Sequence, residues 1–433
     1  MPCSVQIYSP GNSPALGFVL AFIFDDFFGC GFELISNKES LSGDAVVFNY
    51  SNEAFTNAIN ILPCGYLFEK DLKVFPEVSL FEWEGIPAFF KTEGTIPFDL
   101  FSAVFFLLSR AEEYANSDRD KHGRFSAVHS LFDVAFIQRP VIDEWLTELR
   151  NRFLENSKVS LPKRNFKWIN TYDIDVAYAY RHRPAIRVVA ASLRNIFRLD
   201  LKAFFERFSV LIGGKPDPYD TYLFQKEVSI AHADETIYFF LLANKNKFDR
   251  NLSYNSKGMK SLVTFVKEFA LVGIHPSYAS GENPELMSLE IGRLENLSKE
   301  NVSRSRQHFL RFNLPETYRG LIKNGIAEDY SMGYADLPGF RSGTCTPHYF
   351  FDLEQNTSTK LRVYPLIVME ASLRDYLNYD KSTAHELVRK LGSRVKAVGG
   401  VFTTLWHNDS LSDEPDNYWR DLYFEMAVEL KEL

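Results

Sequence analysis

Cysteine is scarce in this chain: there are four among 433 residues, and none of them forms a CxxC motif. So sparse a set cannot build a disulfide framework, and it favours a reducing compartment and free thiols. A basic excess is missing too, because 56 Asp and Glu outnumber 48 Lys and Arg, with a formal net charge of −8. Domains that bind nucleic acid usually carry a basic face, so the composition argues against a nucleic-acid partner.

Long apolar runs are also absent. The longest are residues 15–24 and 103–108, well short of the roughly 20 residues that a membrane-spanning helix needs. The first residues lack the basic segment followed by an apolar one that a secretory signal has. We therefore expect a cytoplasmic protein with no transmembrane segment, and peripheral contact with a membrane stays open.

Phenylalanine is abundant, with 39 residues within a hydrophobic content of 45 %. This composition, with 24 % charged residues, is typical of a globular protein with large cores. The length favours two or three domains. The polar segment 155–164 is the predicted linker between a domain at 1–157 and a domain at 165–433.

The first domain is predicted to be a smaller mixed α/β unit. Short apolar runs at 45–48 and 86–90 are bounded by residues such as Gly, Asn, Asp and Lys, as is typical of strands. Residues 99–114 predict a helix rich in Phe and Leu, and residues 140–153 predict an amphipathic helix. No chemistry can be assigned to this domain from its sequence.

After the linker, strand-like and helix-like segments alternate. Such alternation predicts an α/β fold with a parallel sheet or barrel and helices outside it. Functional groups in these folds gather at the carboxyl ends of the strands. The predicted strands are 167–170, 236–242, 272–275, 307–312 and 402–406, and the predicted helices are 199–211, 257–270, 285–301, 315–324 and 382–398.

Most of these strands carry or lead into a reactive side chain. The first leads to Asp173 and Asp175, which face the same side because they are two residues apart. Two carboxylates so close repel each other unless a cation or a shared proton neutralises them. The pair suggests a metal-assisted hydrolytic site; the alternative is that both acids cap a turn.

Three histidines accompany this pair. His275 ends the third predicted strand, His308 lies on the fourth and His407 follows the last. Singly, each could be a loop residue or a hydrogen-bonded, partly buried side chain. An acid pair and three histidines, all on or beside strands, are hard to explain by packing. Arg341, in the segment 339–344 (GFRSGT), could bind an anion or hold a loop carboxylate.

The order and spacing of these motifs resemble a polysaccharide deacetylase domain of carbohydrate esterase family four, over about residues 165–410. Residues 171–175 (TYDID) match the spacing of the family's first motif, 273–275 (GIH) its histidine loop and 405–407 (LWH) its final motif. The resemblance implies a distorted (β/α) barrel of the polysaccharide deacetylase type.

The resemblance also implies roles for single residues. Asp173 would be the general base, and His407 would be the general acid. Asp175 and His275 would be metal ligands. Asp329 falls where the family has the acid that orients the histidine acid.

The chain departs from the family in two motifs. Four residues after His275, where the family has a second histidine, the chain has Ala279, and His308 is the predicted replacement ligand. Zinc in a catalytic site normally takes three protein ligands and leaves a position for water. The family's Arg-x-Pro-Tyr motif is absent, so Arg306 or Arg341 is predicted to hold the base.

The fuller pattern resembles a divergent bacterial branch of the family that has an extra N-terminal domain. Residues 305–311 (SRQHFLR), 339–344 (GFRSGT) and 406–408 (WHN) match that branch closely. The segments 107–114 (LLSRAEEY) and 122–125 (HGRF) look like the domain that is often attached to it.

The resemblance implies a metal-dependent hydrolase that removes an N- or O-acetyl group from a sugar in a polysaccharide or glycan precursor. The cofactor would be a divalent transition metal, zinc first, with cobalt or nickel as alternatives. Tyr278, Trp406 and Tyr334 are predicted to form a platform for an acetylated carbohydrate. Two other functions stay open. One is an inactive sugar-binding module on the same fold, and the other is a metal hydrolase for a phosphoester or amide, suggested by Arg341.

Overall fold

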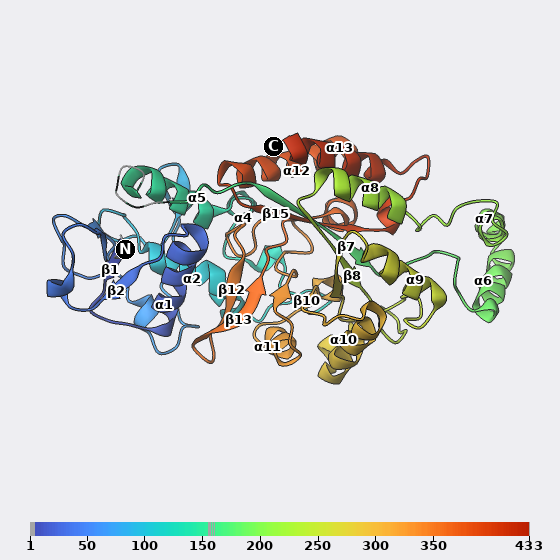
Figure 1. Cartoon of the computed structure of the whole chain (residues 1–433), viewed down its shortest axis with the longest axis horizontal. Coiled ribbons are helices and arrows are strands. Elements are labelled where there is room, and N and C mark those ends of the chain that lie inside the picture. Colours follow the sequence, from blue (N-terminus) through green and yellow to red (C-terminus); the bar gives the residue numbers. More distant parts are fainter. Residues whose placement is uncertain (1–4, 155–156, 158, 160, 433) are drawn as a thin grey trace.

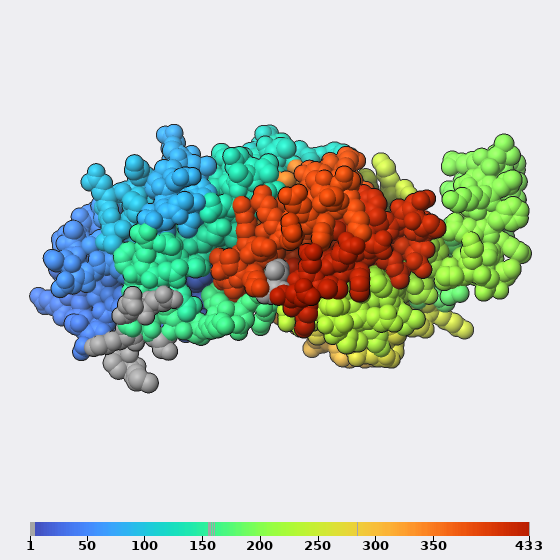
Figure 2. Space-filling view, turned by 90° about the horizontal axis from the view of Figure 1, so that it is seen from above, coloured from blue at the N-terminus to red at the C-terminus, as the bar shows by residue number. Residues whose placement is uncertain are grey.

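The computed structural model describes residues 5–154, 157, 159 and 161–432. The molecule is elongated, with the N-terminal elements at one end and a larger sheet in the middle (Figure 1). A pair of helices, α6 (Ala185–Phe197) and α7 (Leu201–Leu211), stands off the other end (Figure 2). The linker predicted at 155–164 lies partly outside the described residues, and the domain boundaries at 157 and 165 stay a prediction.

The N-terminal part is built on a small parallel sheet with the strand order β2-β1-β3-β4. Its elements are β1 (Val5–Tyr8), α1 (Pro14–Leu20), β2 (Glu33–Ile35), β3 (Val46–Asn49), β4 (Ile59–Asn60), β5 (Phe81–Trp83), β6 (Ile86–Ala88), α2 (Leu100–Ser109), α3 (Ala111–Ala115), α4 (Val134–Ile137) and α5 (Val141–Leu149). Phe18 of α1 and Phe105 of α2 pack on Phe351, with ring centroids 5.1 and 5.0 Å away. The N-terminal core therefore continues into the C-terminal part of the chain.

The C-terminal sheet has nine strands in the order β12-β13-β11-β10-β9-β8-β7-β15-β14. All its pairs are parallel except the hairpin of β12 and β13. The strands are β7 (Lys167–Ile174), β8 (Glu235–Phe240), β9 (Leu271–Ile274), β10 (Arg304–Ser305), β11 (Glu328–Asp329), β12 (His348–Asp352), β13 (Thr357–Val363), β14 (Val368–Met369) and β15 (Val401–His407). The predicted α/β class is confirmed. Closure into a barrel stays a prediction, because β12 and β14 are the end strands of this sheet in the part of the chain that the structure describes.

Helices lie on both sides of this sheet (Figure 1). Besides α6 and α7, they are α8 (Tyr222–His232), α9 (Lys257–Val266), α10 (Pro284–Ser298), α11 (Glu316–Lys323), α12 (Lys381–Ala397) and α13 (Tyr418–Glu432). Tyr423 of α13 packs on Tyr172 of β7 and Trp406 of β15, with ring centroids 6.2 and 4.9 Å away. Among the described residues, no helix is both long and apolar enough to cross a membrane.

One predicted strand is wrong, and one predicted helix is divided into two. Residues 307–312 do not form a strand, because Phe309 and Leu310 have positive φ angles of 62° and 51° and the chain turns into the short 3₁₀ helix His308–Leu310 after β10. The helix predicted over 99–114 is broken at Arg110, whose φ of 58° separates α2 from α3. Both breaks put non-glycine residues in a region that costs energy, so the surrounding contacts have to hold them there.

Those contacts include a buried network of charges that joins the N-terminal helices to the C-terminal part. Arg341 forms two bonds to Glu113, at 2.9 and 2.6 Å. Arg110 lies 2.7 Å from Glu113 and also pairs with Glu112. Burial would raise the pKa of Glu113, but Arg341 and Arg110 lower that pKa to about 2. Because all four side chains are buried, removing one charge leaves another without its partner.

Replacing Glu113 by glutamine should therefore destabilise the protein by about 3–5 kcal/mol, because two buried guanidinium groups lose their shared carboxylate. Urea unfolding of the full chain would measure the change. The control is Glu148→Gln, since Glu148 pairs with the partly exposed Arg152, and it should change stability by less than about 1 kcal/mol. Equal effects of the two substitutions would contradict a structural role for the network.

Candidate active site

Parallel strands bring the candidate residues to one edge of the C-terminal sheet. The register of β7 and β15 sets His407 beside Asp173. His275 follows β9 directly, and two residues separate His308 from the end of β10. Because carboxyl ends of parallel strands meet at one edge, these side chains border a common cavity of about 290 Å³.

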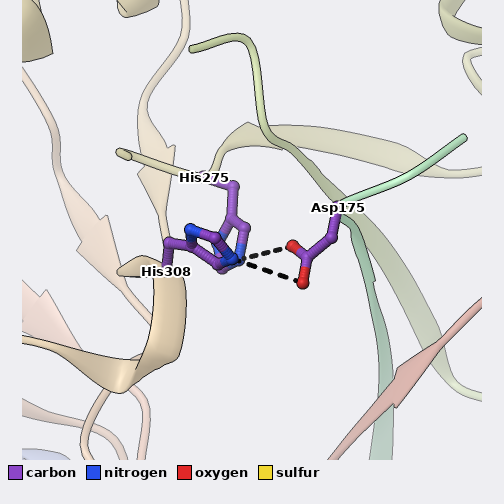
Figure 3. Close-up of side chains that lie close together, drawn as sticks. All are labelled: Asp175, His275 and His308. Carbon is purple, nitrogen blue, oxygen red and sulfur yellow. Dashed lines mark ion pairs between the residues drawn. The ribbon is translucent and has the colours of Figure 1, made fainter. Parts of the chain in front are cut away.

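Three of the residues that line this cavity lie together as potential metal ligands. Asp175, His275 and His308 point toward one another from three different segments (Figure 3), and their ligand atoms all lie within 4.8 Å of one another. His275 Nε2 is 3.2 Å from Asp175 Oδ1, and His308 Nε2 is 3.4 Å from Asp175 Oδ2. The structure thus brings together the three residues that the sequence predicts as ligands.

The other nitrogen of each histidine is held by an acceptor. His275 Nδ1 lies 2.6 Å from the carbonyl oxygen of Arg306, and His308 Nδ1 lies 2.8 Å from Asp249 Oδ1. With Nδ1 donating, each neutral ring presents the Nε2 lone pair toward Asp175, as metal-ligating histidines do. Asp175 Oδ1 is buried, and no donor in the described residues is aligned with it. Two imidazoles and a carboxylate fit a divalent transition metal with an open position.

The charges around these ligands favour a cation. Burial alone would lower the pKa of His308, but Asp175 and Asp249 raise that pKa to about 9. Burial would raise the pKa of Asp175, but His308 and His275 hold it well below its usual value. The two carboxylates therefore favour a positive charge at this position, which a metal cation on the neutral His308 ring would supply in place of a proton.

Asp173 lies beside the three ligands and contacts Arg306. Its Oδ1 is 3.3 Å from Arg306 Nη1, and its Oδ2 is 3.5 Å from His275 Nε2. Arg306 is fully buried, and its Nε donates to the carbonyl oxygen of Tyr330 at 2.9 Å. Arg306 is thus held in place by the backbone of Tyr330 and in turn holds Asp173. The other predicted arginine, Arg341, is engaged by Glu113 and does not line the cavity.

His407 also lines the cavity, from the end of β15. Its Nδ1 is 2.7 Å from Glu370 Oε1, and its Nε2 is 3.8 Å from Asp175 Oδ2. Burial would lower the pKa of His407, but Glu370 raises that pKa well above its usual value. The raised pKa favours the protonated ring, whose Nε2–H would point into the cavity.

Glu370 takes the place in which the sequence predicts Asp329. Asp329 instead accepts hydrogen bonds from Ser305 Oγ at 2.7 Å and Ser331 Oγ at 2.9 Å. Glu370 could have been found by the signal that marks Asp175, because each directly follows a strand. That strand, β14, is only two residues long, so the sequence pattern does not reveal it.

The residues predicted as a sugar platform do not line the cavity. Trp406 alternates with Leu405 and His407, so it faces the helices on the other side of β15 and is fully buried there. Tyr334 is buried beside Arg110, and Tyr278 stacks on Phe248 outside the cavity. The aromatic rings that do line the cavity are those of Phe309 and Tyr376.

One wall of the cavity comes from the N-terminal part of the chain. Arg124 lines it and donates to the carbonyl oxygen of Phe309 and to Tyr376 Oη, both at 2.8 Å. The ring of His122 lies 5.1 Å from that of Phe309. Phe309 is the strained residue that follows His308, so the segment 122–125 helps to hold a candidate ligand in place.

Comparison with known proteins gives one family match. Residues 5–158 match the model of a family of unknown function, DUF7033. This match covers the N-terminal part, including the segment that reaches the cavity. No curated protein matches the chain.

Three solved structures are similar at low identity. One is a provisionally assigned polysaccharide deacetylase from Mycobacterium smegmatis, with 12 % identity, a TM-score of 0.40, and coverage of 64 % of this chain and 87 % of that one. A polysaccharide deacetylase from Bacillus cereus has 11 % identity, a TM-score of 0.29, and coverage of 62 % and 88 %. A 4-alpha-glucanotransferase from Thermococcus litoralis has 12 % identity, a TM-score of 0.35, and coverage of 63 % and 38 %. At these TM-scores the likenesses do not establish an activity, and the chemistry has to be inferred from the side chains.

The purified chain should bind about one divalent transition metal, and His308→Ala should remove most of it, because a site with two protein ligands is weak. Elemental analysis, and the visible spectrum after loading with Co²⁺, would measure this. The matched control is His385→Ala, since His385 lies on α12 and pairs with Glu429. Retention of a full metal equivalent by the His308 variant would show that His308 is not a ligand.

Proposed function

We propose that this chain is a metal-dependent hydrolase that removes an acetyl group from a sugar, on a deacetylase-type barrel. The observation that carries the proposal is the arrangement around one cavity. Asp175, His275 and His308 converge as ligands, with Asp173 3.5 Å from His275 and His407 3.8 Å from Asp175. A candidate base and a candidate acid that both border a metal site suit the addition of water to an acyl group and the departure of its leaving group.

A divalent transition metal on these ligands would lower the pKa of a water molecule and polarise the acetyl carbonyl. Asp173 would take the proton of that water. Arg306, at 3.3 Å, orients the Asp173 carboxylate through Oδ1, and the Oδ2 atom near His275 is left to accept the proton. The water oxygen forms a bond to the acetyl carbon.

His407 would complete the reaction by protonating the leaving group. The bond between the acetyl carbon and the sugar nitrogen or oxygen breaks, and Nε2–H of His407 donates its proton to that atom, so that acetate and an amine or hydroxyl are released. The Glu370 carboxylate holds Nδ1–H and stabilises the charged ring. A group of this kind typically contributes 10²–10⁴-fold to the rate.

The walls of the cavity favour an acyl substrate. Leu310, Met369 and Leu405 belong to one small apolar cluster and line the cavity beside His308 and His407. Such a surface fits the methyl end of an acetyl group. Phe309 and Tyr376, on the side of the N-terminal segment, supply rings for a sugar face.

A phosphoester has less support than an acetyl group. The two arginines that line the cavity are engaged, Arg124 by Asp120 and Arg374 by Asp375. Arg341, which suggested an anionic substrate, lies outside the cavity lining. An inactive binding module would need neither a base nor a protonated acid, and this cavity has candidates for both.

Replacing Asp173 by asparagine should lower turnover about 10²–10⁴-fold, because the amide cannot take a proton, and should leave the metal bound. Release of acetate from N- and O-acetylated oligosaccharides would measure turnover, with metal content determined on the same samples. The control is Asp421→Asn, because Asp421 is exposed on α13. Undiminished turnover of the Asp173 variant would rule out its role as base.

Replacing Glu370 by glutamine should move the alkaline limb of the kcat/KM profile to lower pH. His407 donates only while it is protonated, and Glu370 raises its pKa, so neutralising Glu370 lowers the pH at which activity is lost. The pH profile of acetate release would show the shift. Glu425→Gln, at a surface pair with Lys381, should leave the limb in place. An unchanged limb in the Glu370 variant would contradict the assignment of His407 as acid.

A further inference from the structure

Helices α6 and α7 form a hairpin that stands apart from the rest of the molecule (Figure 2). They pack on each other within the connection between β7 and α8. Nothing in the chemistry of the cavity requires such an extension.

The hairpin exposes a large amount of apolar surface. Along α6 the exposed apolar residues recur every three or four positions, as they do along α7, so each helix carries an apolar stripe. Phe197 and Leu199 are 85 % and 83 % exposed. The exposed residues are Ile186, Val189, Leu193, Ile196, Phe197, Leu199, Leu201, Phe205, Phe208, Leu211 and Ile212.

The covered residues of the two helices are both polar and apolar. Asn195 is buried on α6, and Arg207 of α7 donates to Ser192 of α6 at 3.5 Å. Val210 of α7 is buried as well, but most of the large apolar side chains of the hairpin face outward, where a water-soluble hairpin usually carries polar ones.

The hairpin is also basic in an acidic protein. Residues 185–215 contain six Lys or Arg and two Asp or Glu, whereas the whole chain has a net charge of −8. In the described part of the chain, Arg187, Arg194, Arg198 and Lys202 form no ion pair with a carboxylate. Basic side chains beside an apolar stripe are typical of helices that lie in the headgroup region of a membrane with anionic lipids.

The base of the hairpin is firmly attached to the rim of the cavity. Asp217 accepts from the backbone N–H groups of Ala179, Tyr180 and Arg181 at 2.8, 2.9 and 2.9 Å. Asn408, the neighbour of His407, donates to the carbonyl oxygen of Tyr219 at 2.9 Å. The hairpin is thus tied to the loops that follow β7 and β15, next to Asp175 and His407.

We propose that α6 and α7 dock this protein on the surface of a membrane that contains anionic lipids. With 13 and 11 residues, the helices are too short to span a bilayer, so they lie in its interface with their apolar residues among the acyl chains. A second copy is a poorer occupant, because two hairpins would bring the same unpaired positive charges together.

Sedimentation of the full chain with vesicles tests this proposal. The protein should bind vesicles of phosphatidylcholine mixed with phosphatidylglycerol at least about tenfold more tightly than vesicles of phosphatidylcholine alone, and added salt should weaken the binding. The double variants Phe197→Ser/Phe205→Ser and Arg194→Glu/Arg198→Glu should each lose about tenfold or more.

The control variants are Leu289→Ser and Lys260→Glu, which change an exposed apolar and an exposed basic residue on α10 and α9, and both should bind vesicles like the wild type. Circular dichroism establishes that all four variants are folded. Absence of wild-type binding to mixed vesicles, or equal binding to both vesicle types, would overturn the proposal. So would a dimer in light scattering that the hairpin variants convert to a monomer without any vesicle binding, because a second copy would then cover the hairpin.

Discussion

The parallel ladder between β7 and β15 is the constraint on which the candidate site depends. It sets His407 beside Asp173, and a slip of one residue would turn one of the two side chains to the opposite face. Buried side chains secure this register. Thr171 Oγ1 donates to the carbonyl oxygen of Thr404 at 2.6 Å, and Arg306 donates to Thr171 in turn. Arg306, which orients the candidate base Asp173, therefore also helps to hold β7 and β15 in register.

The N-terminal part of the chain supports this arrangement from outside the sheet. Two of its motifs, 107–114 and 122–125, meet two motifs of the C-terminal part, 339–344 and 305–311. The first contact is the pair of Glu113 with Arg341, which fixes one half of the molecule on the other. The second is the contact of Arg124 with the backbone beside a candidate ligand. Neither contact performs chemistry, which explains why these motifs give no catalytic signal in the sequence.

Much of this architecture can be predicted from the sequence. Four of the five predicted strands of the C-terminal part correspond to β7, β8, β9 and β15, because each is a compact apolar run. The acids and histidines at their ends lie together because parallel topology leaves them few other positions. His308 is predicted on a strand and lies on a 3₁₀ helix, yet its side chain still meets Asp175, since both follow strands that end at the same edge of the sheet.

Other features depend on contacts between residues far apart in the chain, and local patterns do not show them. Arg341 and Glu113 are 228 positions apart in the sequence, and Glu370 and His407 are 37 positions apart. Arg306, which contacts the candidate base Asp173, and Arg341, which pairs with Glu113 of a distant helix, cannot be told apart by their sequence context. The prediction for Trp406 failed for a different reason. Trp406 directly precedes His407 on β15, and successive side chains of a strand point to opposite faces of the sheet.

The uneven distribution of charge along the molecule affects how it would be oriented at a charged surface. With four net positive charges between residues 185 and 215, the remainder carries twelve net negative charges, since the whole chain has −8. A negatively charged surface would attract one end of this long molecule and repel the other. The resulting torque would turn the long axis away from that surface and leave the N-terminal end furthest from it.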